Sequence, residues 1–243
     1  MGAVAAHYTP DLASAVHNSR HFESCLPLYD LYVTTKRYEL EVYRAREAND
    51  VMFPWQGSDN RFVEETACGR LAHRPPDVVF VGHMEAHYVA LLSRVRSVTK
   101  KVCVHGPGWE NIAKQEIFWR GIASGPVWGS GLPSALARGR IGLGLLSKRY
   151  PDAFTTRSFE VPAAATMLLG ERTPDHLELF EEDREAVFFA DEEELCDKLQ
   201  FYLDNEAAGL KIAKAARARV LSNYHWKHVL APVVQRISEL KHG

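Results

Sequence analysis

Residues 155–169 read TTRSFEVPAAATMLL, in which a polar loop leads into a short helix and the helix leads into an apolar strand. A loop that enters a helix presents backbone N–H groups without helical partners and the positive end of the helix dipole, and both favour a phosphate group. Arg157 would add positive charge there, and Glu160 could accept hydrogen bonds from two neighbouring sugar hydroxyls. The stretch therefore predicts a helix–strand corner that suits a nucleoside diphosphate.

On both sides of this corner the chain alternates short apolar runs with longer amphipathic ones, which is typical of a parallel α/β sheet. Near the amino terminus we predict strands at residues 30–34 and 51–53 and a helix at residues 36–48 between them. A second series of predicted strands, with helices between them, covers residues 77–81, 101–105, 141–146, 166–169 and 186–189. Helical spacing of apolar residues predicts that the C-terminal third is helical.

A polar stretch rich in turn formers, residues 54–76, separates the two series and ends in Pro75-Pro76. We therefore predict a partial N-terminal Rossmann-like domain in residues 1–60, a linker in residues 61–76, and a nearly complete Rossmann-like domain with closing helices in residues 77–243.

The predicted N-terminal domain is short of strands. A remnant of about two strands buries too little apolar surface to stand alone. It must rest on the second domain, on a C-terminal helix in residues 226–240, or on another copy of the chain. We expect self-association through an exposed apolar face of residues 30–53, and thus a possible homo-oligomer.

Composition limits the classes of partner. The 243 residues carry 29 basic and 31 acidic side chains and a net charge of -2, so nucleic acid and anionic membranes are not expected partners. Four cysteines, at 25, 68, 103 and 196, form no Cys-x-x-Cys pair, which argues against zinc and a disulfide framework and favours the reducing cytoplasm. We expect no signal peptide, no myristoylation and no membrane helix.

Three segments occur in one order: FVGH at residues 80–83, HGPGWE at 105–110 and LSKRYPDAFTTRSFEVPA at 146–163. Together they resemble the CgeB-like glycosyltransferases, and the resemblance extends from about residue 29 to residue 237. It implies a GT-B fold, in which two Rossmann-like domains face each other across a cleft and the C-terminal domain holds the nucleotide-sugar donor. The expected fold class is thus α/β, a Rossmann-like parallel-sheet domain of GT-B type with a truncated second α/β domain.

The family's Arg-x-Phe-Glu element falls on Arg157, Phe159 and Glu160. Asp152, eight residues before Glu160, takes the place of the first acid in a Glu-x7-Glu pair. Where the family usually has Gly five residues after the second acid, this chain has Ala165, which adds a methyl group where a backbone would approach its neighbours closely.

The resemblance and the strand ends together suggest a set of donor-binding residues. Gly82 would approach the diphosphate or the sugar, and Val127 with Trp128 would pass the nucleotide base. Each also has a plain structural alternative, such as a tight turn or, for Trp109 and Trp128, core packing. The full set of candidate donor-binding residues is Gly82, Gly106, Trp109, Val127, Trp128, Thr155, Thr156, Arg157, Ser158 and Glu160.

Candidate catalytic residues are Arg157, Asp152 and His83. Arg157 would neutralise the leaving diphosphate, Asp152 could orient the sugar or stabilise positive charge at its anomeric carbon, and His83 could hydrogen-bond the sugar. A surface salt bridge between Arg157 and Glu160, and an ordinary turn role for Asp152, are the structural alternatives.

Many GT-B enzymes carry a cation beyond the first loop of the donor domain, but the segment Met84–His87 supplies none, which leaves Lys148 or Arg149 to assist Arg157. His83 and His87 would share a helix face at zinc-binding spacing, yet no third ligand is evident and we predict no metal site.

These features predict a metal-independent glycosyltransferase that moves a sugar from a UDP- or GDP-linked donor to an unknown acceptor hydroxyl, without a cofactor and with retention of anomeric configuration expected from the family. A non-catalytic nucleotide-sugar-binding or partner subunit is the alternative, favoured by Ala165, the missing cation and the short N-terminal domain. A Rossmann oxidoreductase is disfavoured because no Gly-x-Gly-x-x-Gly follows a predicted strand.

Overall fold

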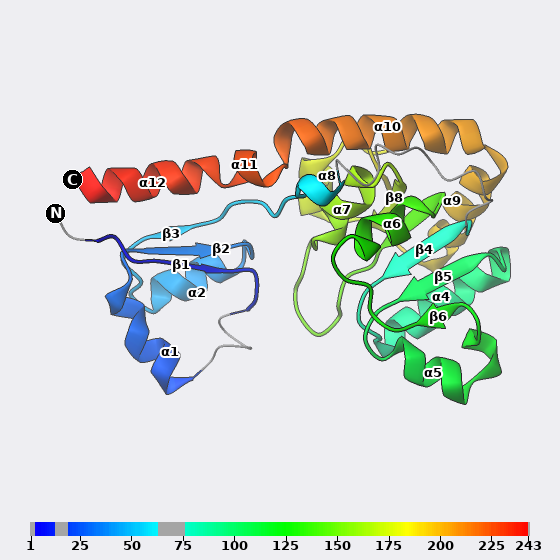
Figure 1. Ribbon diagram of the computed structural model, residues 1–243, viewed down its shortest axis with the longest axis horizontal. Coiled ribbons are helices and arrows are strands. Elements are labelled where there is room, and N and C mark those ends of the chain that lie inside the picture. The colour runs from blue at the N-terminus through cyan, green and yellow to red at the C-terminus, as the bar shows by residue number, and fades with distance from the viewer. Residues whose placement is uncertain (1–2, 13–18, 63–75, 243) are drawn as a thin grey trace. The chain divides into compact units, whose positions relative to one another are not determined.

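The computed structural model describes residues 3–12, 19–62 and 76–242 (Figure 1). The chain forms two compact units: residues up to Gly57 together with Asn223 onward, and Ser58–Ser222. The sequence-based division instead assigned all of residues 77–243 to the second domain. Most of the predicted linker, residues 63–75, lies outside the described residues.

The first unit contains a three-stranded parallel sheet in the order β1-β2-β3. Its strands are β1 (Ala6–Thr9), β2 (Leu31–Thr34) and β3 (Val51–Met52), and its helices are α1 (Arg20–Cys25), η1 (Leu26–Leu28) and α2 (Glu39–Ala45). The predicted β-α-β unit corresponds to β2, α2 and β3. Strand β1 was missed because it has only four residues and two of them are exposed.

Two C-terminal helices, α11 (Trp226–Val229) and α12 (Ala231–His242), complete this unit. Leu31 and Val33 of β2 are buried against Val233 of α12, with Ile237 and Leu240 packed beside them. The expectation of an exposed apolar face in residues 30–53 is therefore wrong for β2. Three supports were considered for the short N-terminal sheet, and the structure shows one of them: the C-terminal helix α12 packs on β2.

The second unit contains a six-stranded parallel sheet in the order β6-β5-β4-β7-β8-β9. Figure 1 labels β6, β5, β4 and β8 of this sheet. Its strands are β4 (Val78–Val81), β5 (Val102–His105), β6 (Ala123–Ser124), β7 (Ile141–Gly144), β8 (Met167–Glu171) and β9 (Val187–Phe189). Numbered along this unit, the order is 3-2-1-4-5-6, the arrangement of doubly wound dinucleotide-binding sheets. The predicted Rossmann-like sheet is confirmed, apart from the two-residue strand β6, which has no apolar run.

Helices connect these strands and cover the sheet. They are α4 (Ala86–Val98), α5 (Trp109–Gln115), η2 (Ile117–Trp119), α6 (Gly131–Ala137), α7 (Arg157–Ala163), α8 (Pro174–Leu179), α9 (Glu192–Asp204) and α10 (Glu206–Asn223). One apolar core joins the sheet to α4, α9 and α10, with Leu92, Leu199 and Ile212 among its members. In the described ranges no helix combines the length and the apolar content needed to cross a bilayer.

Candidate functional site

A pocket of about 190 Å³ lies at the carboxyl ends of β4 and β7. These two strands adjoin where the strand order reverses, which is where open α/β sheets place ligands. The pocket is lined by Phe80, Val81, Gly82, His83, Glu85, Tyr88, Leu145, Thr155, Thr156 and Arg157. The structure thus brings five predicted site residues together, from two segments far apart in sequence: Gly82, His83, Thr155, Thr156 and Arg157.

Arg157 is the first residue of α7 and is tied to the end of β4. Its Nε donates a hydrogen bond of 2.8 Å to the Val81 carbonyl oxygen, and its Nη1 pairs with the Glu160 carboxylate. Burial lowers the pKa of Arg157 to about 10, so the guanidinium remains charged at neutral pH. Of the described residues that line the pocket, only Arg157 carries a permanent positive charge.

Two backbone N–H groups at the start of α7 are already bound by the preceding loop. The Arg157 N–H donates to Thr155 Oγ1 at 3.2 Å, and the Ser158 N–H donates to the Thr155 carbonyl oxygen at 3.0 Å. The expectation that this helix start offers open N–H groups is therefore wrong for these two. A phosphate in the pocket would depend mainly on the guanidinium.

Ser158 is buried and forms part of a hydrogen-bonded chain behind the pocket wall. Its Oγ accepts from the Thr155 N–H at 3.2 Å and lies 2.7 Å from His176 Nε2. His176 Nδ1 lies 2.6 Å from the Glu171 carbonyl oxygen, which can only accept, so Nδ1 carries the hydrogen and Nε2 accepts from Ser158. Burial lowers the pKa of His176, in keeping with a neutral ring. Ser158 therefore positions Thr155, rather than facing a ligand as expected.

Glu85, which the sequence analysis passed over, also lines the pocket. It precedes α4 as its N-cap residue, and its Oε2 accepts from Ser147 Oγ at 3.1 Å. His87 Nδ1 lies 3.6 Å and Arg149 Nε 4.0 Å from the same oxygen. The sequence could have indicated Glu85 only through its position, four residues beyond the end of β4 at the ligand-binding edge of the sheet.

The two other candidate cations lie outside the lining residues. Lys148 pairs with the Glu171 carboxylate, which also accepts from the Leu146 N–H at 2.8 Å. The side chain of Arg149 is 72% exposed. Water therefore screens its charge strongly.

His83 and His87 do not share a helix face, because α4 begins at Ala86 and His83 lies in the loop before it. His83 is exposed at the pocket, whereas His87 Nε2 lies 3.0 Å from the Leu146 carbonyl oxygen. Within the described residues no group of three metal-ligating side chains occurs.

Gly106 and Trp109 join the loops that follow β4 and β5. Gly106 has a φ of +147°, and a Cβ there would overlap the Gly82 carbonyl oxygen. The Trp109 Nε1 donates to the same oxygen at 2.9 Å, and its ring is fully buried against Phe80 and Trp119. The structure gives Trp109 the core role that was its alternative, and Gly106 the role of permitting close loop packing.

The remaining candidates do not line the pocket. Val127 and Trp128 lie between β6 and α6, and Trp128 is 74% exposed. Asp152 is half-buried and lies close enough to Tyr88 to raise the pKa of that phenol, although burial is the larger cause.

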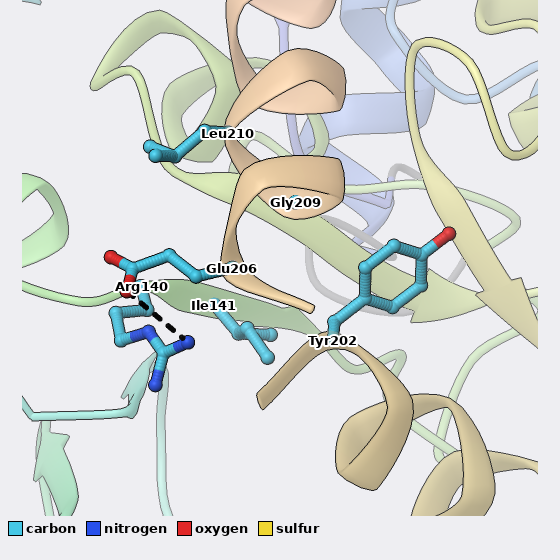
Figure 2. A pocket seen from close by; sticks show the side chains of 6 residues that line it. All are labelled: Arg140, Ile141, Tyr202, Glu206, Gly209 and Leu210. Carbon is cyan, nitrogen blue, oxygen red and sulfur yellow. Dashed lines mark ion pairs between the residues drawn. The ribbon is translucent and has the colours of Figure 1, made fainter. Parts of the chain in front are cut away.

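A second hollow lies at the opposite end of β7 (Figure 2). Its volume is about 10 Å³, room for about one water molecule. Arg140 beside it pairs with Asp77 at 3.3 Å and Glu206 at 3.8 Å and donates to the Leu203 carbonyl oxygen. This hollow is too small for a nucleotide, and its charges join the start of β7 to the start of β4 and to α9 and α10.

Residues 84–235 match the family model described as "Glycosyl transferase-like". A search of curated proteins finds no match.

Solved structures with a similar fold include HepE from Anabaena in complex with UDP, at a TM-score of 0.70 and 12% identity, covering 96% of this chain and 72% of that one. Sucrose-phosphate synthase from Thermosynechococcus elongatus is similar at a TM-score of 0.69 and 14% identity, covering 98% and 68%. A glycosyltransferase from Rickettsia africae is similar at a TM-score of 0.65 and 13% identity, covering 97% of this chain and 76% of that one. These likenesses show the GT-B type of fold. Because the family model spans more than half of the sequence, the chain belongs to the glycosyl transferase-like family.

Proposed function

We propose that this protein binds a nucleoside diphosphate sugar in the pocket between β4 and β7 and transfers the sugar to an acceptor hydroxyl group. The observation that carries the proposal is Arg157, a charged guanidinium fixed to the end of β4 and lining the pocket at the switch point of the sheet. Family membership and the UDP complex of the similarly folded HepE support it.

In this reaction the bond between the anomeric carbon and the diphosphate oxygen breaks, a bond to the acceptor oxygen forms, and the acceptor loses a proton. The electron pair goes to the diphosphate, and Arg157 would stabilise the negative charge that develops there. Its low exposure, 23% of the side chain, strengthens this interaction because little water screens the charge. His83 would hydrogen-bond the sugar from the opposite loop.

Glu160 remains our candidate for the ribose hydroxyls, since its carboxylate lies beside Arg157. Asp152 remains a candidate for orienting the sugar, and Gly82, Gly106, Val127 and Trp128 for the rest of the donor. We further propose the closer relation to CgeB-like enzymes, a UDP- or GDP-linked donor, and retention of anomeric configuration. Metal independence is proposed because the sequence contains no Asp-x-Asp pair and Arg157 could supply the required charge.

Calorimetric titration with UDP and GDP tests the proposal. Arg157→Ala should weaken binding of the diphosphate by about 10- to 100-fold, as expected for a lost charge-assisted hydrogen bond. The matched control is Arg184→Ala, whose side chain is 71% exposed and lies outside the pocket, and which should bind as the wild type does. A wild-type protein that binds neither nucleotide, or an Arg157→Ala variant with unchanged affinity, contradicts the proposal.

A non-catalytic nucleotide-sugar-binding subunit remains a second candidate function. It is favoured by a specific feature: among the described residues that line the pocket, Arg157 is the single permanent cation, so no second one is available to the leaving group. Binding of the donor without transfer to any acceptor and without hydrolysis, in the presence and absence of EDTA, would support this candidate. Turnover that persists in EDTA would support the metal-independent enzyme.

A further inference from the structure

We infer that Glu85 contacts the sugar part of the donor and restricts this protein to sugars that carry no negative charge. The inference rests on the proposed function and adds the class of sugar and the residue that selects it.

The pocket contains one fixed charge of each sign. Arg157 lines it from the start of α7, and Glu85 lines it from the loop between β4 and α4. Its volume of about 190 Å³ is below the roughly 300–1,000 Å³ of typical ligand pockets, so it receives only part of a nucleotide sugar. The part that fits must satisfy both charges.

Glu85 is held in place through one of its two carboxylate oxygens. Within the described ranges, its hydrogen bond from Ser147, its ion pair with Arg149 and its 3.6 Å approach to His87 Nδ1 all involve Oε2. No contact to Oε1 is seen in that part of the chain, so this oxygen can accept hydrogen bonds from a ligand. The side chain is 13% exposed, which leaves the carboxylate preorganised and poorly screened.

This arrangement fixes the direction of the ligand. A diphosphate beside Glu85 would meet a like charge, whereas beside Arg157 it meets an opposite one. The hydroxyl groups of a sugar can donate to a carboxylate, so the sugar would lie toward Glu85. Neutral sugars and amino sugars satisfy Glu85, while the carboxylate of a uronic acid is repelled.

The surroundings of Glu85 reinforce the negative potential. Tyr88 lines the same pocket, and its phenol has a raised pKa, first because it is buried and further because Glu85, Glu171 and Asp152 lie close to it. Lys148 offsets the charge of Glu171, and Arg149 is too exposed to offset that of Glu85 fully.

Calorimetry with three kinds of ligand tests the inference: a nucleoside diphosphate without a sugar, one with a neutral sugar, and one with an anionic sugar. The probes are UDP, UDP-glucose and UDP-glucuronate, with GDP, GDP-mannose and GDP-mannuronate as the guanine series. In Glu85→Gln, binding of the free diphosphate should stay within about twofold of the wild type. The neutral sugar form should bind about tenfold more weakly, and the anionic form about tenfold more tightly, because the charge is removed and a weaker neutral acceptor remains. The control Glu116→Gln changes an exposed carboxylate outside the pocket and should alter none of these values.

Ser147→Ala is a second test variant, used if a thermal melt shows that Glu85→Gln is unstable. It keeps the charge but removes the hydroxyl that holds Oε2, so the neutral sugar should bind more weakly while the anionic sugar stays excluded. The inference is overturned if Glu85→Gln still binds the diphosphate but has the same ratio of affinities for neutral-sugar and anionic-sugar donors as the wild type. The proposed function is then left intact. A wild type that binds no diphosphate overturns the proposed function itself.

Discussion

At the residue scale, the backbone conformation of Ala165 accounts for the glycine that the CgeB-like pattern would place there, in a way that differs from the expectation of close packing. Its φ is +57°, in the left-handed region, and it follows Ala164, the C-cap residue of α7. The Ala165 N–H donates to the Pro162 carbonyl oxygen at 2.9 Å and the Thr166 N–H to the Val161 carbonyl oxygen at 3.3 Å, so the residue ends the helix. Glycine is favoured here by backbone conformation, which is the ordinary helix C-terminal arrangement.

Ala165→Gly should therefore raise the free energy of unfolding, by about 0.5–1 kcal/mol, since relief of left-handed strain outweighs the added chain entropy of glycine. Chemical denaturation measures it. Ala163→Gly, at the fully buried last residue of the same helix, is the control and should lower stability by about 1 kcal/mol. A destabilised Ala165→Gly variant would show that the methyl group makes packing contacts worth more than the strain.

Glu160 supports a second prediction at this scale. Glu160→Ala should weaken UDP binding by about tenfold through lost ribose hydrogen bonds, but should not weaken binding of pyrophosphate, which has no ribose. Removing a negative charge beside Arg157 strengthens the binding of any phosphate ligand. Pyrophosphate binding reports this charge effect alone, whereas UDP binding also reports the lost ribose hydrogen bonds. Equal losses for UDP and pyrophosphate in calorimetry would mean that Glu160 acts only by orienting Arg157.

At the scale of elements, the chain Thr155, Ser158, His176 and Glu171 links the loop before α7 to α8 and the end of β8. Burial lowers the pKa of His176 from its usual 6.5, so the folded state binds this proton less readily than the unfolded state. The stability that depends on the neutral ring is complete above about pH 6.5 and is lost as the pH falls toward the lower pKa of the folded protein.

His176→Asn tests this dependence, because the amide N–H can still donate to the Glu171 carbonyl oxygen but the side chain cannot be protonated. Denaturation curves between pH 7.5 and pH 5 should show the wild type losing stability more steeply than the variant. Parallel pH profiles would indicate that the ring is accessible to protons in the folded state.

Elements with strong patterns could be predicted from the sequence, whereas single contacts could not. The buried apolar runs of β4, β7 and β8 stand out because both faces of a parallel sheet are covered. The pocket corner at Arg157 was accessible through its loop–helix–strand pattern and the family resemblance. The partnership of Ser158 with His176 spans 18 residues and depends on packing, and nothing in one sequence distinguishes Glu85 from other carboxylates beyond a strand end.

At the scale of the whole molecule, the packing of α12 on β2 yields a test with a matched neighbour. Val233 is 7% exposed against Leu31 and Val33, whereas Val234 is 64% exposed. Val233→Asp buries an unpaired carboxylate and should destabilise the first unit by about 3 kcal/mol or more. Val234→Asp should have little effect.

Light scattering measures the consequence. Uncovering the apolar side of β2 should turn Val233→Asp into a self-associating protein while Val234→Asp keeps the wild-type mass. Equal behaviour of the two variants would mean that α12 contributes little to covering the sheet.

The first unit is built from two segments that are far apart in the sequence, and this affects the order in which its contacts can form during synthesis. The second unit, residues 58–222, is continuous in sequence, so all of its residues are available once this segment has left the ribosome. Leu31 and Val33, however, must wait for Val233, which at ordinary rates of translation means roughly 10–40 s with their side chains uncovered. During that interval chaperones can bind the exposed apolar side chains of β2. A ribosome that stalls before α12 would release a chain whose first unit exposes this apolar surface.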